Sequence, residues 1–335
     1  MKSPSAQVTL SAVMCLVSAG LGAVVTASTV TAAETATTTA AASAALAAAG
    51  PQTFESPAQA ADAMIEAAEK FDVTSLLKIV GHDGEDIVLT GQFAQDRERA
   101  EEFAAQARKK NRVSVDPKSG RAWLLVGEQE WPFALPIVKR GSRWSFDVAA
   151  GREELFNRRI GSNELDAIAI CHGFVDAQYD YAFRKREGYD VAQYAQRVIS
   201  TPGKHDGLAW QRADGTWDGP VGEKIAHAIQ QGYSVKGDPY HGYFFKVLKG
   251  QGPNAPLGAM DFVVGGVMIG GFALVAAPAE YAVTGLKTFM VSHTGVVYEK
   301  DFGPGTLEAF QKMERFDPDK SWKPVQESSP ADKHP

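Results

Sequence analysis

Four side chains in the second half of the sequence could carry acid–base chemistry: His205, Asp206, His241 and Glu280. His205 and Asp206 share a glycine-flanked stretch that reads as a loop, where functional groups are common. Imidazole and carboxylate groups exchange protons near neutral pH, so these residue types predict general acid–base catalysis. A nucleophile for His205 would be Ser200 or Thr201, which precede it closely in the sequence.

The spacing of these residues also supports a purely structural interpretation. Side chains this close in sequence rarely form a nucleophile–base pair, and the sequence has no Gly-x-Ser-x-Gly motif. His241 lies between two tyrosines at the start of a predicted strand, where its ring would pack and its nitrogens would find backbone partners. Glu280, in Pro-Ala-Glu-Tyr, is expected to hold a turn. Both interpretations stay open from the sequence alone.

The composition limits the function classes. The chain has 335 residues, 44% hydrophobic and 22% charged, which is a globular balance with room for two domains. A net charge of −6 without a basic, aromatic-rich cluster argues against nucleic-acid binding. No phosphate-binding Gly-x-x-x-x-Gly-Lys-Ser/Thr loop is present, so we expect no nucleotide cofactor.

The first 52 residues predict export. Lys2 precedes an uncharged apolar run at residues 8–27, and small residues then lead to Ala33 and the acidic Glu34. This order is typical of a signal peptide, residues 1–33, cleaved near Ala33, and it predicts a periplasmic protein. If cleavage fails, the same run would anchor the chain in the membrane. Residues 34–52 are rich in Ala and Thr and predict a disordered tether.

Cleavage would leave Cys171 as the one cysteine of the mature chain, because Cys15 lies in the signal segment. A single thiol cannot form an intramolecular disulfide, so the fold must depend on packing. We expect Cys171 to be a small buried hydrophobic residue rather than a nucleophile.

A helix over residues 163–184 should organise the second half of the chain. Leu165, Ile168 and Val175 recur at helical spacing on one stripe, while Ile170 and Phe174 belong to a second stripe. A helix with two apolar stripes is usually packed between two layers. A shorter helix should precede it and stop at Gly161.

The alternation of apolar residues changes on either side of this helix. Residues 53–150 read as helices at 57–71, 74–80 and 96–110, followed by strands at 121–126, 130–138 and 143–148. Residues 242–248, 262–264, 271–277, 287–292 and 296–300 read as strands of an antiparallel meander packed on the long helix, and residues 219–231 as a helix. Five aromatic residues load the first sheet and would form its core or line a ligand pocket: Trp123, Trp131, Phe133, Trp144 and Phe146.

Two resemblances follow from these elements. The order of helices and then antiparallel strands in residues 53–150 is similar to the cone-shaped cystatin-like and nuclear-transport-factor-like folds. Residues 163–301 resemble the headgroups of type IV pilins and type II secretion pseudopilins, through Asp176 to Tyr181, Gly242 to Phe245, and Thr288 to Val291. The chain departs from pilins in lacking a prepilin cleavage site and in having charged residues before residue 163. Polymerisation into a fibre is therefore not implied.

Seven short segments support a further resemblance: Gly151 to Glu154, Arg158 to Gly161, Glu164 to Ile168, Thr201 to Lys204, Tyr240 to Tyr243, Ile269 to Phe272 and Pro278 to Tyr281. Through them, residues 54–322 resemble a bacterial family of unknown function, DUF2950. The family implies no activity. The pseudopilin resemblance implies calcium as the metal to consider, with Asp261 and Asp301 as the nearby acids, although calcium binds six to eight oxygens.

These observations predict an α+β protein with a cone-like domain at 53–150, a pilin-headgroup-like domain at 151–317 and a disordered tail at 318–335. The leading functional hypothesis is a non-enzymatic binding or assembly module of the periplasm or cell envelope, with a protein partner. The alternative is a periplasmic hydrolase that uses the His205 and His241 region. A third hypothesis is a small-ligand pocket lined by the aromatic residues of the first sheet.

Overall fold

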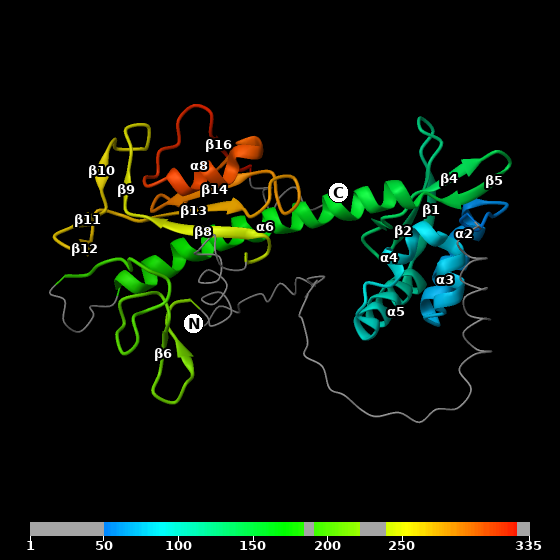
Figure 1. Cartoon of the computed structure of the whole chain (residues 1–335), viewed down its shortest axis with the longest axis horizontal. Coiled ribbons are helices and arrows are strands. Elements are labelled where there is room, and N and C mark those ends of the chain that lie inside the picture. Colours follow the sequence, from blue (N-terminus) through cyan, green and yellow to red (C-terminus); the bar gives the residue numbers. More distant parts are fainter. Residues whose placement is uncertain (1–49, 184–190, 222–238, 327–335) are drawn as a thin grey trace, which may run out of the picture. The chain divides into compact units, whose positions relative to one another are not determined.

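The computed structural model describes residues 50–183, 191–221 and 239–326. Within them the fold is α+β: helices and antiparallel sheets alternate along the chain, as predicted (Figure 1). Two separate hydrophobic clusters form, one from residues 54–148 and one from residues 167–322. The helix, strand and cluster boundaries do not by themselves define domains, so the proposed domain limits stay predictions.

The first cluster lies between helices and a five-stranded antiparallel sheet. The helices are α2 (Pro57–Glu69), α3 (Val73–Val80), α4 (Glu85–Val88) and α5 (Phe93–Lys109), with a 3-10 turn at His82–Gly84. The strands are β1 (Asn111–Val115), β2 (Ala122–Val126), β3 (Trp131–Pro132), β4 (Ile137–Arg140) and β5 (Arg143–Phe146), in the order β1-β2-β4-β5 with β3 beside β2.

Local signals explain where the first helices begin. Ser56 accepts a hydrogen bond from the Gln59 amide, and Pro57 occupies the first helical position of α2, as the sequence predicts. Asp72 caps α3 in the same way through the Ser75 amide. Gly81 ends α3 with a φ of 77°, a backbone conformation that glycine adopts without strain.

The first sheet differs from its prediction at two places. The expected strand 130–138 is interrupted, because Pro132 and Pro136 cannot donate ladder hydrogen bonds, and only β3 and β4 remain of it. Strand β1 was not predicted, because Asn-Arg-Val-Ser-Val carries too few apolar residues to signal a strand. Its place at an edge of the sheet requires little burial on that side.

One continuous helix, α6 (Val148–Phe183), replaces the two helices predicted on either side of Gly161. The expectation that Gly161 ends a helix is wrong, because a glycine inside a helix costs only about 1 kcal/mol and packing at both ends exceeds that cost. Near its start, Gly151 packs against Leu135 of the first cluster. Its second half packs on the second sheet.

The two predicted stripes of α6 are buried to different extents. Ile170, Cys171, Phe174 and Tyr181 of one stripe are at most 9% exposed. On the other stripe Val175 is 7% exposed, whereas Leu165, nearer the middle of the helix, is 68% exposed. The helix therefore covers one face of the second sheet, and the described residues place no second layer over Leu165.

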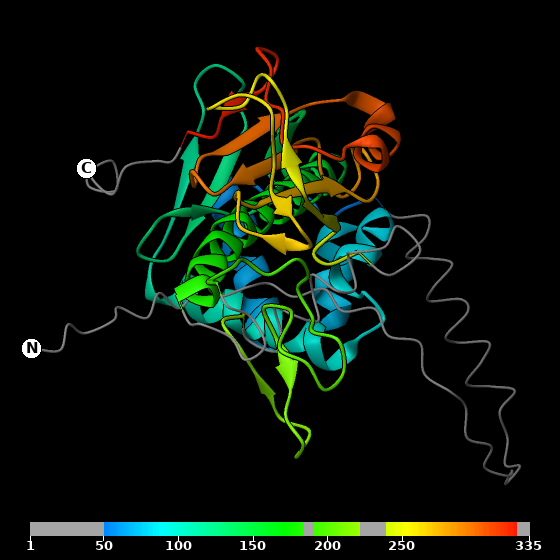
Figure 2. The ribbon, with the colours of Figure 1, turned by 90° about the vertical axis from the view of Figure 1, so that its left-hand side faces the viewer.

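The second sheet is an antiparallel meander, in the order β16-β15-β14-β13-β8. It contains the strands predicted at 242–248, 271–277, 287–292 and 296–300, whereas the strand predicted at 262–264 pairs in a separate two-stranded hairpin. Its strands are β8 (Tyr243–Leu248), β13 (Ala273–Pro278), β14 (Thr288–Ser292), β15 (Val297–Lys300) and β16 (Lys323–Pro324). Every residue of β13 and β14 is buried, since α6 covers one face and the short helix α8 (Thr306–Lys312) contacts the other (Figures 1 and 2). Burial on both faces explains why these strands read as unbroken apolar runs.

Short hairpins complete the second unit. They are formed by β6 (Trp210–Gln211) with β7 (Trp217–Asp218), β9 (Gly250–Gln251) with β10 (Met260–Asp261), and β11 (Val263–Val264) with β12 (Val267–Met268). Strand β9 was not predicted, and β16 pairs with β15 inside the segment expected to be a disordered tail. Most of the helix predicted at 219–231 falls outside the described residues.

Candidate functional site

Three polar side chains near the middle of α6 hold two turns of the second sheet. Asn163 Nδ2 donates to the Thr284 carbonyl at 2.9 Å. One carboxylate oxygen of Glu164 accepts from the amides of Leu286 and Lys287 at 2.8 and 3.0 Å. Asp166 contacts the ring of His241. We call the set Asn163, Glu164, Asp166, His241 and Thr284 the helix–turn junction.

His241 lies in a two-residue hairpin turn. The Tyr240 and Tyr243 backbones exchange two hydrogen bonds, at 3.0 and 2.9 Å, and the φ angles of His241 and Gly242 are 46° and 73°. Two successive positive φ values define a type I′ turn, for which Asn-Gly is the favoured sequence. Gly242 cannot be replaced easily, because an added Cβ would lie 2.7 Å from the Thr284 Cβ.

The imidazole of His241 is oriented by two neighbours. Its Nδ1 atom meets the Asp166 carboxylate, and its ring lies over that of Tyr240 with centroids 4.2 Å apart. Burial, and then the charge of Asp166, raise the pKa of the Tyr240 hydroxyl. A carboxylate on Nδ1 leaves Nε2 as the nitrogen that can accept a proton, which is the arrangement of a histidine base.

Glu280 acts through its backbone rather than through its carboxylate. The Glu280 carbonyl accepts from the amides of Val283 and Thr284, and its own amide donates to the Thr284 hydroxyl. These bonds form the turn that presents Thr284 to Asn163. The structure thus brings His241 and the Glu280 turn to the same junction, although no contact between their side chains occurs among the described residues.

His205 and Asp206 serve a different part of the fold. Asp206 accepts from the Thr201 amide and hydroxyl at 2.7 and 2.8 Å, and the Gly207 amide donates to Ser200 Oγ. Burial raises the pKa of the Asp206 carboxyl, but the bonds from Thr201 and the charge of Arg197 outweigh burial and leave the pKa below its ordinary value. Both candidate hydroxyls therefore close the loop rather than meet a histidine.

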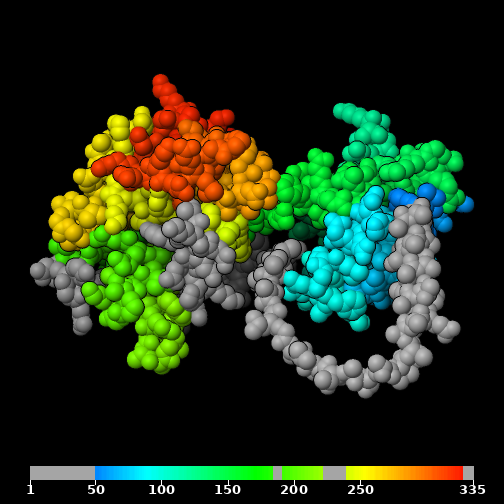
Figure 3. Space-filling view, in the orientation of Figure 1, coloured from blue at the N-terminus to red at the C-terminus, as the bar shows by residue number. Residues whose placement is uncertain are grey.

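The His205 ring packs on Trp210, with centroids 4.5 Å apart, at the base of the β6–β7 hairpin, which projects from the surface (Figure 3). The backbone carbonyl of His205 accepts a hydrogen bond from the Tyr181 hydroxyl at 2.7 Å. Asp166, which holds His241, precedes Tyr181 by about 22 Å along α6, at about 1.5 Å per residue. The two histidines therefore belong to separate environments and do not form one acid–base set.

The two acids considered for calcium also lie apart. Asp261 pairs with Arg315 at 2.5 Å, whereas Asp301 accepts from the Gly303 amide and lies 3.9 Å from Lys287. Within residues 50–183, 191–221 and 239–326, no three His, Cys, Asp or Glu side chains are grouped as a metal site requires. The described residues give calcium no evident set of ligands.

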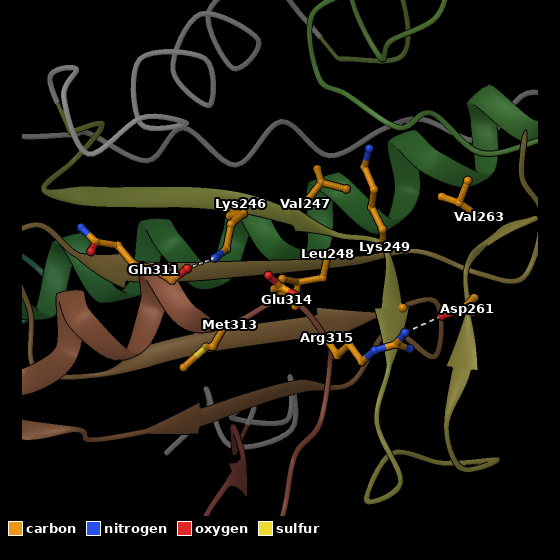
Figure 4. A pocket seen from close by; sticks show the side chains of 11 residues that line it. Lys246, Val247, Leu248, Lys249, Asp261, Val263, Gln311, Met313, Glu314 and Arg315 are labelled. Atoms are coloured by element: carbon orange, nitrogen blue, oxygen red, sulfur yellow. Dashed lines mark hydrogen bonds and ion pairs between the residues drawn. The ribbon is translucent and has the colours of Figure 1, made fainter. Parts of the chain in front are cut away.

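An open hollow of about 550 Å³ lies between β8 and the chain that follows α8 (Figure 4). Lys246 at one end donates to the carbonyls of Phe310 and Gln311, and burial lowers the pKa of its ammonium group. Arg315 at the other end is paired with Asp261. Both cations already have partners within the protein. We therefore interpret the hollow as a contact between structural elements rather than as a ligand-binding site.

The aromatic residues of the first sheet do not line one pocket. Phe133 packs against Phe103 and Phe146 inside the first cluster, with ring centroids 4.7 and 6.1 Å apart. Trp131 instead is 62% exposed beneath the guanidinium of Arg158, 5.5 Å away. Phe133 and Phe146 thus pack in the core while Trp131 lies at the surface, which favours the core interpretation over the ligand pocket.

Comparison with known proteins assigns the family. The family model described as "Protein of unknown function (DUF2950)" matches residues 51–325. The chain belongs to the DUF2950 family. No curated protein and no solved structure matches it. Among the residues that the structure describes, no helix has the length and apolar character needed to cross a membrane.

The helix–turn junction gives a physical reason for several segments through which the sequence resembles DUF2950 proteins. Glu164 to Ile168, Tyr240 to Tyr243 and Pro278 to Tyr281 are far apart in sequence and meet there. Sequence reasoning selected His241 and Glu280 but not Asp166, Asn163 or Glu164. Their acidic and amide side chains at a predicted helix start resembled ordinary capping groups, and only the tertiary contacts distinguish them.

Proposed function

We propose that this DUF2950 protein is an exported, non-enzymatic binding or assembly module of the bacterial periplasm or cell envelope. One observation carries the proposal: each candidate catalytic residue contributes to a structural contact. Asp206 bonds Thr201, the Glu280 backbone forms a turn, the His205 ring packs on Trp210, and His241 joins the sheet to α6. The signal-peptide pattern of residues 1–33 supports export.

The second sheet and the half of α6 that packs on it support a finer proposal, that residues 151–317 act as a headgroup similar to those of pseudopilins. An antiparallel meander packed on a long helix is the arrangement that the resemblance implies. Such a unit would present loops and strand edges to a protein partner while α6 joins it to the first unit. No metal needs to be invoked for this role.

A chemical cross-linking experiment in the source bacterium tests the proposal. The chromosomal protein carries a C-terminal affinity tag, cells are fractionated, and cross-linked products are identified after denaturing purification. We expect the protein in the periplasmic or envelope fraction, with a mature N-terminus near Glu34 and a reproducible envelope partner. A cytoplasmic protein that keeps residues 1–33, or one without any recurring cross-link, would contradict the proposal.

A periplasmic hydrolase is the second candidate, and the pairing of His241 with Asp166 is the observation that favours it. The purified protein is screened against ester, glycan and peptide substrates. His241→Asn provides the sharpest variant, because asparagine suits the type I′ turn but cannot act as a base. An activity that His241→Asn abolishes would support the hydrolase. An activity that survives this change would exclude His241 as its base.

A further inference from the structure

Strand β1 has one side that no other described strand covers. It forms an edge of the first sheet and pairs only with β2, in the hairpin that Figure 1 and Figure 2 show in teal. The Gly127 amide donates to the Lys110 carbonyl, and the Asp116 amide donates to the Arg121 carbonyl. These two bonds set which residues of β1 face β2.

Backbone groups alternate in an antiparallel strand, so residues 110, 112, 114 and 116 direct their amides and carbonyls toward β2. The amides and carbonyls of Asn111, Val113 and Val115 must then point away from it. In the part of the chain that the structure describes, no strand pairs with this side of β1. Asn111 and Val115 are both exposed, and the exposed fraction of Val115 is 50%.

An unpaired edge of this kind is a template for another strand, and natural edges are usually blunted by proline, a bulge or a covering element. β1 contains no proline, and its register with β2 runs unbroken from Asn111 to Val115. The charges of Lys110 and Arg112 are offset locally, because both side chains contact Glu130, at 3.3 and 2.6 Å. The charges of Lys110 and Arg112 therefore protect this edge against pairing with another strand less than the sequence alone suggests.

The β1 sequence complements itself. An antiparallel pair of two β1 strands with its two-fold axis at Val113 sets Asn111 opposite Val115 and Arg112 opposite Ser114. The same axis sets Lys110 opposite Asp116 of the second copy, at both ends of the pair. All the outward backbone groups of the strand find partners, and no charge lies directly opposite a like charge, which would disfavour pairing.

We propose that β1 is a self-association edge, at which two copies of this protein join their first sheets into one continuous antiparallel sheet. The partner in this proposal is a second copy of the protein. The proposal rests on the assembly role proposed above only for its biological meaning. A pair of five-residue strands is small for an interface, so we expect a roughly micromolar dissociation constant.

Sedimentation of the full-length protein at increasing concentration provides the first test. We expect a monomer–dimer equilibrium that Val115→Pro abolishes, because proline removes an outward amide without breaking a bond to β2. Val115→Thr is the matched control; it keeps the amide and the branched side chain, and should dimerise like the parent. A monomer at every concentration, or equal dimerisation of Val115→Pro, would overturn the proposal.

Disulfide trapping tests the register. In a Cys15→Ser background, Arg112→Cys and Ser114→Cys proteins are mixed under mild oxidation and compared with each protein alone. The proposed pair places these two positions about 4.5 Å apart between Cα atoms, close enough for a disulfide. We expect at least a fivefold faster cross-link in the mixture. Equal rates in the mixture and in the separate proteins would exclude this register.

The two proposals fail in different ways. A monomeric protein that still cross-links to an envelope partner in cells would refute the β1 edge and leave the binding role standing. A dimer that contains β1 pairs but resides in the cytoplasm would refute the envelope role and leave the edge intact.

Discussion

Two buried glutamine side chains of this protein hold the backbone of irregular segments. Gln178 of α6 is fully buried and exchanges two hydrogen bonds of 2.8 Å with the Ala195 backbone. Gln251 holds the carbonyls of Pro256 and Gly258 at 2.6 and 2.7 Å. Such bonds position irregular segments that have few apolar residues of their own, because a buried loop needs partners for its backbone.

Asp96 illustrates the same rule for a charged group. Its side chain is 1% exposed and accepts from the Thr90 amide, the Thr90 hydroxyl and Arg99. Burial raises the pKa of this carboxyl, but these hydrogen bonds outweigh burial and hold the pKa below its ordinary value. A carboxyl whose pKa is lower in the folded state stabilises the fold above the unfolded-state pKa of about 3.9.

We therefore predict that Asp96→Asn lowers the free energy of unfolding by about 2 kcal/mol near neutral pH. The contribution of Asp96 disappears as the pH falls through its folded-state pKa, so parent and variant should converge in acid. Urea unfolding from pH 7 to pH 3, followed by circular dichroism, measures the difference. A gap that is independent of pH would show that the carboxylate charge plays no part.

His241 offers a second prediction at this scale. A residue with a Cβ and a positive φ is strained, and asparagine tolerates this conformation better than alanine does. We expect His241→Ala to be about 1 kcal/mol less stable than His241→Asn in urea unfolding. Since both variants lose the contact with Asp166, the comparison isolates the turn. Equal stability would indicate that the contact, rather than the turn, constrains this position.

At the scale of elements, α6 is the one whose extent differed most from the sequence interpretation. Its glycines have different surroundings. A Cβ on Gly151 would lie 2.6 Å from the Leu135 Cγ, whereas a Cβ on Gly161 would meet nothing within 4 Å. Gly151 is therefore required for close packing, and Gly161 is a tolerated weak point of the helix.

This contrast predicts opposite signs for the same substitution in one helix. Gly161→Ala should stabilise the protein by about 1 kcal/mol, through helix propensity alone. Gly151→Ala gains the same propensity but forces Leu135 to move, and we expect a net loss of about 1–2 kcal/mol. Thermal and urea unfolding of the two variants provide the measurement. A stabilising Gly151→Ala would mean that Leu135 repacks at no cost.

At the scale of the whole chain, the two hydrophobic clusters are distinct, and α6 contributes to both. Val148 belongs to the first cluster, and the buried apolar residues between Ala167 and Tyr181 belong to the second. Cys171 lies fully buried in the second cluster, and burial raises the pKa of its thiol to about 12. A thiol in this state is neither accessible nor ionised at neutral pH.

Cys171 should therefore report the opening of the second cluster. In a Cys15→Ser variant, we expect no reaction with a thiol reagent over minutes at pH 7.5 in buffer, and full reaction in denaturing urea. The urea dependence of the labelling rate, compared with the loss of helical circular dichroism, shows whether the second cluster opens with the bulk of the helix. Rapid labelling of the native protein would contradict the burial of Cys171.

The amino-acid sequence by itself determined the α+β class, the capped start of α2, and four of the five strands of the second sheet, because caps and alternating apolar residues act over a few neighbours. Tertiary structure alone decided that α6 is one helix, that β13 and β14 are covered on both faces, and that Asp166 meets His241 while His205 does not. Those outcomes depend on contacts between different elements, such as Asp166 with His241, 75 positions apart, and no local pattern encodes which distant partner a side chain will meet.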